Sequence, residues 1–219
     1  MAIIQGVTSG NGLEVDTDNH ALMNPRAPAF GALGYYREAV VSGAIAATLA
    51  AGSTLLSFRW TDATRLALIQ SVRVSGLITG AVTTGVPFDL ALFIARGFTA
   101  NDTGGTALLP TATGQKLRTS MGGSLVGDLR VATTGTLTPG TRSLDAQPLD
   151  RIQGFTGTAL GTSPFGAGLQ PLYLRENSDE HPIVLAQNEG FVVQNPLAGP
   201  ATGTLTLLFR VEWGEVAKY

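Results

Sequence analysis

Residues 181–216 read HPIVLAQNEGFVVQNPLAGPATGTLTLLFRVEWGEV, and this stretch decides the fold that we expect. Two apolar runs, 183–186 and 191–194, flank the turn-forming residues 188–190, a pattern typical of a β-hairpin. A connection rich in Gly and Pro follows, and residues 204–216 then alternate as a strand with one buried face. The residues predicted to face the core are Leu205, Leu207, Phe209, Val211 and Trp213. We expect these strands to pair at the centre of the domain.

The same alternation occurs upstream in residues 54–60, 65–79 and 87–98, which predicts three further strands with a buried face. Within 65–79 one parity is largely aliphatic, namely Leu66, Leu68, Gln70, Val72 and Val74. Residues 79–86 (TGAVTTGV) are typical of a hairpin-like loop. Shorter strands are expected at 35–41, 128–133 and 169–175. The last of these belongs at a sheet edge, because Pro171 cannot donate a ladder hydrogen bond.

These segments predict roughly eight strands and no long amphipathic helix, which favours an antiparallel β-sandwich with a jelly-roll topology. Residues 44–51 are compatible with one helical turn or with a strand–turn–strand passage. Residues 99–124 and 135–158 are expected to form long loops, and loops of this length usually serve contacts or function. We divide the chain into an extended N-terminal arm, residues 1–36, and a sandwich domain, residues 37–219. The arm is expected to lie either over a neighbouring subunit or on its own domain.

Composition supports a strand-rich protein that contacts partners. Of the 219 residues, 44% are hydrophobic and only 14% are charged, and 28 are Gly and 11 are Pro. The net charge of −2 gives no general attraction to nucleic acid. There is no cysteine, the N-terminus does not have the pattern of a signal peptide, and no apolar run approaches the roughly 20 residues of a membrane span. We therefore expect a protein made in the cytosol.

Candidate metal-binding residues are few. His20 and His181 are able to bind zinc or act as a general base, but neither has a partner at ligand spacing, which favours exposed or capping roles. Glu14, Asp16 and Asp18 suit a calcium loop by their oxygen ligands, but the EF-hand pattern is missing. A solvated acidic segment, or a partner for arginine residues, is the favoured interpretation.

The sequence carries no catalytic motif of the GxSxG, P-loop or GxGxxG type. Asp89 and Glu212 are acids in otherwise apolar strands. They are compatible with a glycosidase pair, but an ion pair with Arg96 or Arg210 is the favoured role. Phe58, Trp60, Phe209 and Trp213 are aromatic residues of a kind that can stack on sugars, yet they share parity with Leu and Val, which favours core packing. We expect no enzyme activity, no catalytic residues, no cofactor and no metal.

Several stretches resemble a group of structural proteins of tailed bacteriophages. They are GVTSGNGLEVD (6–16), FRWTDATRLALIQSVRVSG (58–76), GVPFDLALFIARGFTANDTGGTAL (85–108), LRTSMGGSLVGDLRVATT (117–134) and EHPIVLAQNEGFVVQNP through RVEWGEV (180–216). The resemblance covers most of the chain and consists of strand and turn patterns. It implies a cement or decoration protein that forms trimers on the phage head, binds the major capsid protein and strengthens the shell by bridging neighbouring subunits.

The expected location is therefore the outer capsid surface of the virion, after synthesis in the host cytoplasm, without direct contact with nucleic acid or membrane. The candidate partner-binding residues lie in the arm, the first strand and the loops: Glu14, Asp16, Asp18, Arg26, Tyr35, Arg37, Arg118 and Arg142. Arginine suits such contacts because its planar guanidinium pairs with carboxylates and is weakly hydrated. The alternative is a tail-associated or receptor-binding protein that holds a host glycan with residues 99–124 and 134–168.

Overall fold

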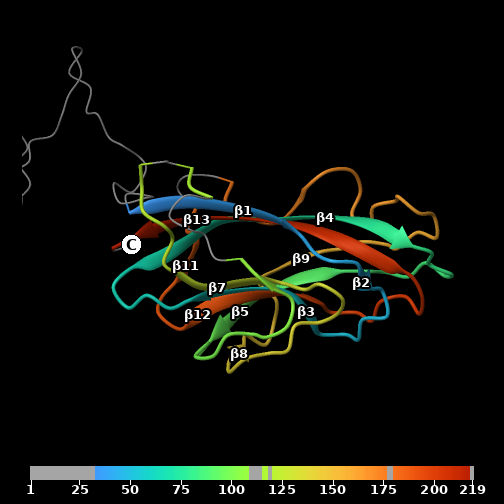
Figure 1. Cartoon of the computed structure of the whole chain (residues 1–219), viewed down its shortest axis with the longest axis horizontal. Helices are drawn as coiled ribbons and strands as arrows, with labels where there is room; N and C mark the ends of the chain where they lie inside the picture. Colours follow the sequence, from blue (N-terminus) through green and yellow to red (C-terminus); the bar gives the residue numbers. More distant parts are fainter. Residues whose placement is uncertain (1–32, 109–114, 118–119, 177–179, 218–219) are drawn as a thin grey trace, which may run out of the picture.

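The computed structural model describes residues 33–108, 115–117, 120–176 and 180–217. These residues form two antiparallel sheets, one of six strands and one of seven, that pack face to face. Figure 1 shows the sheets as two layers, with β1, β13 and β4 in one and β3, β5, β7 and β12 in the other. The described part of the chain contains no helix. The predicted antiparallel β-sandwich is confirmed.

The six-stranded sheet is built around β13, the strand formed by the end of the quoted stretch. β13 pairs with β1 on one side and with β4 on the other, as expected for a central strand. Pro171 lies in the edge strand β10, where its missing N–H is tolerated, so this prediction is confirmed. The strands of this sheet are β1 (Gly34–Val41), β2 (Ile45–Ala46), β4 (Leu66–Gly80), β10 (Gln170–Leu174), β11 (Ile183–Leu185) and β13 (Thr204–Val216).

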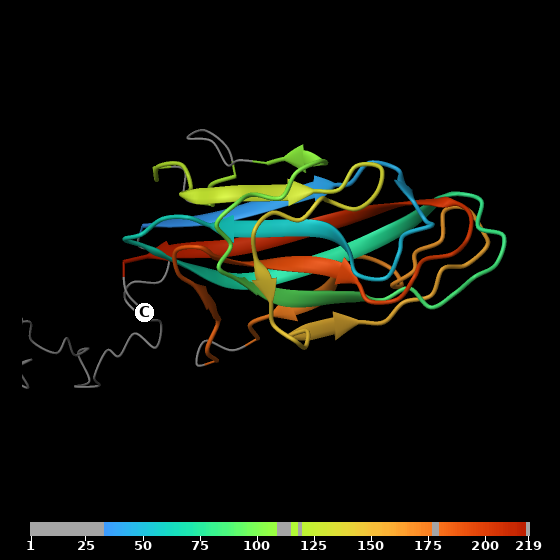
Figure 2. The same cartoon turned by 90° about the horizontal axis from the view of Figure 1, so that it is seen from below.

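The seven-stranded sheet has β12 between β3 and β5, and further short strands extend both sides. Viewed from below, the long strands run along the length of the molecule and the connections gather at its ends and lower side (Figure 2). The strands are β3 (Ser53–Trp60), β5 (Leu90–Arg96), β6 (Thr106–Ala107), β7 (Val126–Val131), β8 (Ser143–Leu144), β9 (Asp150–Ile152) and β12 (Glu189–Asn195).

An aromatic cluster joins the two sheets. Tyr36 and Trp213 of the six-stranded sheet stack with ring centroids 5.6 Å apart, and Phe58 meets Trp213 edge-on at 5.4 Å. Phe58 also stacks on Phe191 at 5.2 Å within the seven-stranded sheet. Phe58, Trp60, Phe209 and Trp213 are all completely buried. These aromatic residues therefore form core, as predicted, and cannot serve as exposed platforms for sugar rings.

A β-bulge in β4 changes which residues of that strand face the core. Trp213 lies opposite Ile69 and Glu212 lies opposite Ser71, so Gln70 is an extra residue in the ladder. Ala67 and Ile69 face the core before the bulge, and Val72 and Val74 face it afterwards. The predicted single parity from Leu66 to Val74 is therefore right only for its second half.

Two connections predicted as hairpins instead cross between the sheets. β11 pairs with β4 in the six-stranded sheet, whereas β12 pairs with β3 and β5 in the other, so residues 186–188 form a corner and not a hairpin turn. Residues 81–89 likewise connect β4 to β5 across the sandwich. Residues 45–46 form a short strand, which is the strand alternative for 44–51. The boundary expected at residue 36 falls inside β1, which begins at Gly34 and buries Tyr36 in the core.

Candidate functional site

The outer face of the six-stranded sheet carries a cluster of charged side chains that includes two predicted partner-binding residues, Tyr35 and Arg37. Arg37 Nε donates to Glu212 Oε1 at 2.5 Å, and Arg210 Nε donates to the same oxygen at 2.9 Å. Tyr35 Oη donates to Glu212 Oε2 at 3.5 Å. The expected ion pair between Glu212 and Arg210 is thus confirmed. The alternation that buries Trp213 and Val211 places Glu212 on the opposite face.

Arg73 of β4 extends this cluster across a third strand, because it lies directly opposite Arg210 in the β4–β13 ladder. We call Arg37, Arg73 and Arg210, together with Glu212, the arginine face. Burial would raise the pKa of Glu212, but the ion pairs with Arg210 and Arg37 outweigh it and hold the pKa below its usual value. The arginine face therefore keeps three positive charges against one negative charge at neutral pH.

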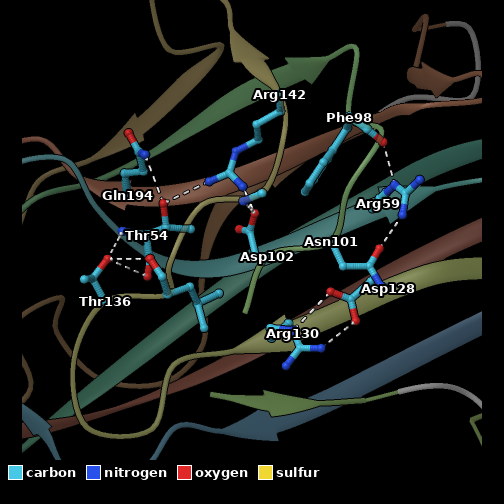
Figure 3. A network of polar contacts seen from close by, with 12 residues as sticks. Thr54, Arg59, Phe98, Asn101, Asp102, Asp128, Arg130, Thr136, Arg142 and Gln194 are labelled. Atoms are coloured by element: carbon cyan, nitrogen blue, oxygen red, sulfur yellow. Dashed lines mark hydrogen bonds and ion pairs between the residues drawn. The ribbon is translucent and has the colours of Figure 1, made fainter. Parts of the chain in front are cut away.

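Arg142, also predicted to bind a partner, is instead buried against Asp102, and this corrects the expectation. The two side chains are 3% and 0% exposed and form an ion pair. Arg142 Nη2 also donates to Thr54 Oγ1 at 3.2 Å, and the guanidinium lies over the Phe98 ring at 5.0 Å. Burial lowers the pKa of Arg142 to about 10, which leaves it charged at neutral pH. Figure 3 shows Arg142 pointing from its loop toward Asp102 and Thr54.

The same network fastens two of the long connections to the seven-stranded sheet (Figure 3). Arg59 of β3 donates to Phe98 O at 2.5 Å and to Thr99 O at 2.9 Å, and Arg130 of β7 donates to Gly104 O at 2.9 Å. Asp102 Oδ1 accepts a hydrogen bond from Gly140 N at 2.8 Å. Residues 97–107 and 133–145 are therefore held in fixed positions. Nothing in the local sequence pairs Asp102 with Arg142, which are 40 positions apart.

A second anchor, at the end of β13, holds the segment 120–125. Glu215 is completely buried and accepts hydrogen bonds from Ser124 Oγ at 2.6 Å and from Leu125 N at 2.9 Å. Trp213 Nε1 donates to the same Ser124 Oγ at 3.1 Å. Burial raises the pKa of Glu215, although these donors and Arg65, 3.8 Å away, partly oppose the rise. Glu215 therefore fixes residues 124 and 125 to the end of β13.

A groove of about 500 Å³ lies between the edges of the two sheets, where β5 and β9 face β10 and β11. Its charged or polar lining includes Arg96, Asp150, His181 and Glu189, and its apolar lining includes Ile94, Leu149, Tyr173 and Ile183. His181, singled out from the sequence, has Nδ1 at 2.7 Å from Pro182 O. The groove combines aliphatic walls with acidic and basic groups, which suits a small polar ligand.

The acids proposed for a glycosidase pair lie apart and in ion pairs. Glu212 belongs to the arginine face, whereas Asp89, just before β5, binds Arg151 and not the expected Arg96. Arg96 instead pairs with Asp145 at 2.9 Å and with Glu189 at 3.3 Å. Within the described ranges, no group of three or more His, Cys, Asp or Glu residues is arranged to hold a metal ion. Glu14, Asp16, Asp18, His20, Arg26 and Arg118 lie outside those ranges.

Comparison of the chain with protein-family models, with curated proteins and with solved structures found no match. The part of the chain that the structure describes has no helix long and apolar enough to span a membrane. The class of protein that fold and surface define is therefore an all-β sandwich with anchored loops and a positively charged sheet face.

Proposed function

We propose that this chain is a bacteriophage capsid cement protein, which binds the head shell from outside and bridges neighbouring subunits. The observation that carries the proposal is a sandwich whose long connections are fixed to it by the buried ion pair Arg142–Asp102 and by hydrogen bonds. A protein that bridges shell subunits must hold its contact loops in place before binding, because ordering them on contact would reduce affinity. The resemblance to phage structural proteins adds to this argument.

The topology supports the same proposal. β1 pairs with β13, β3 with β12, β4 with β10, and β5 with β8 and β9, so the chain resembles one long hairpin wrapped into two sheets. That connectivity is what a jelly roll built from two Greek keys requires, with β6 and β7 added at one edge. We therefore retain jelly roll as the proposed topology, and a trimer bound to the major capsid protein as the proposed assembly.

Exposed apolar side chains on the connections offer contact points for a shell. Phe155 and Leu160 are 57% and 62% exposed and lie on the connection between β9 and β10. Large apolar residues at such positions are favoured in interfaces. Many small contacts of this kind add up when each trimer engages several subunits at once.

The test is copy number together with shell stability. Purified particles are separated on a gel, and the amount of this protein is compared with that of the major capsid protein. We expect many copies, distributed over the head in electron micrographs, and a fall in head melting temperature when the protein is omitted. The variant F155S/L160S should bind heads more weakly, whereas the exposed Leu197→Ser substitution, on the β12–β13 connection, serves as matched control. A few copies confined to the tail would contradict the proposal.

The groove favours a second candidate, a tail-associated or receptor-binding protein that holds a host glycan. Asp150 and Leu149 belong to the loop region 134–168, and Tyr173 adds an aromatic ring of the kind that stacks on sugars. In that case a host polysaccharide should bind the isolated protein, and the substitution Asp150→Asn should weaken it. Binding to heads with normal shell strengthening, and no glycan binding, would favour the cement protein.

A further inference from the structure

The arginine face contains a like-charge pair, Arg73 and Arg210, of which only Arg210 has an acidic partner among the described residues. Arg73 and Arg210 are directly opposite each other on adjacent strands, about 5 Å apart at the backbone. Glu212 forms ion pairs with Arg210 and Arg37, but no ion pair joins Arg73 to an acid among the described residues. Arg73 Nε is buried from solvent and has no hydrogen-bond partner there. A buried donor without an acceptor costs free energy, so an acceptor brought to Arg73 would stabilise the protein.

The chain itself contains a segment with the matching charge. Glu14, Asp16 and Asp18 occupy every second position, so in an extended conformation their carboxylates share one face about 7 Å apart. Residues 1–25 contain these three acids and no Lys or Arg. Three carboxylates thus match the three arginines of the face. The 14 residues 19–32 between the segment and Leu33 reach up to about 50 Å when extended, which allows contact within one chain or with a neighbouring copy.

We propose that the acidic segment Glu14–Asp18 binds the arginine face, with its carboxylates on Arg73 and Arg210. The contact supplies the acceptors that Arg73 lacks and removes the repulsion between the two guanidinium groups. It is a property of the isolated protein, so its failure would leave the capsid proposal standing, and failure of head binding would leave this contact standing.

The absence of cysteine from the chain makes a clean distance measurement possible. The full-length substitution pair T17C/S75C is labelled with nitroxides, since Ser75 lies two residues from Arg73 on the same face. Pulsed electron spin resonance should give one narrow, short-distance peak. It should broaden in 1 M NaCl, where the screening length falls to about 3 Å. Mixing singly labelled chains then tells whether the segment comes from the same or a neighbouring copy, and a short peak in either case supports the contact.

Two sets of substitutions test which charges hold the segment. R73Q/R210Q and, separately, E14Q/D16N/D18N should each abolish the narrow peak, and the second set leaves the sandwich untouched. The matched control Arg96→Gln removes an exposed arginine from the other sheet and should leave the peak unchanged. Charge reversal on both sides, R73E/R210E with E14R/D16R/D18R, should restore it. A broad distribution in the parent protein, or a narrow peak that survives both sets, would overturn the proposal.

Discussion

The buried ion pair between Arg142 and Asp102 should be among the most sensitive polar contacts of the molecule. The substitution Arg142→Met keeps much of the side-chain volume but leaves Asp102, which is 0% exposed, without its counter-charge. Removing one partner of a buried pair typically costs about 3–5 kcal/mol, because the remaining charge stays buried and uncompensated. For a domain of this size the loss corresponds to a fall in melting temperature of about 6–20 °C. Loss of the contact with Phe98 acts in the same direction.

Urea denaturation followed by tryptophan fluorescence measures this loss, since Trp60 and Trp213 are buried in the core. Arg96→Met is the matched control, because Arg96 and Asp145 are 56% and 40% exposed and such pairs contribute about 0–1 kcal/mol. The double variant D102L/R142M should be more stable than the sum of the single losses predicts, since it leaves no unpaired buried charge. If Arg142→Met lowers the free energy of unfolding no more than Arg96→Met does, then the pair drawn in Figure 3 does not hold the loops in place.

Three further substitutions test other parts of the structure. Glu212→Gln should reduce stability at neutral pH. The difference from the parent protein should vanish as the pH falls through the lowered pKa of Glu212, because the carboxyl group of the parent is then protonated. Melting curves at several pH values measure this difference. Glu215→Gln should show the opposite trend. Because the pKa of Glu215 is raised, the parent protein loses stability as the pH rises through that pKa, whereas the variant, whose glutamine does not titrate, does not. A parallel pH dependence of the two proteins would contradict this. Gly190→Ala should cost about 1–3 kcal/mol, since a Cβ there would collide with the Phe58 carbonyl oxygen and lie 2.9 Å from Phe98, whereas Gly135→Ala, with open space around it, should be neutral in the same urea titration.

Much of the fold was predictable because it depends on local alternation. The period of two in residues 87–98 and 204–216 identifies strands and their core faces without knowledge of their partners. In residues 54–60 the period identifies the strand, but the expectation of a single buried face is wrong, because Leu55 and Ser57 on the other face are buried as well. Pro171 identified an edge strand for an equally local reason, its missing N–H. The β4 bulge was not predictable, because the extra residue at Gln70 is defined by its pairing with β13, a strand far along the chain.

The candidate site was predicted less completely. Arg37 and Tyr35 were found from their place in the first strand, and both contact Glu212. Arg142 is an arginine like Arg37 and lies in a loop, so it was expected to be exposed. It is buried because the folded chain brings Asp102 and Phe98 next to it. Arg73 was not among the predicted contacts, because its significance arises from Arg210 on the adjacent strand.

The stretch 181–216 by itself determined that the protein contains β-strands and that Phe209, Val211 and Trp213 form part of its core, because side-chain alternation is a property of each strand alone. Only the tertiary structure decided that residues 186–188 turn a corner between two sheets instead of closing a hairpin. The physical reason is that a turn sequence specifies only a change of chain direction. The sheet that each strand joins depends on its pairing partner, β4 for β11 and β3 for β12, and these partners lie far away in the sequence.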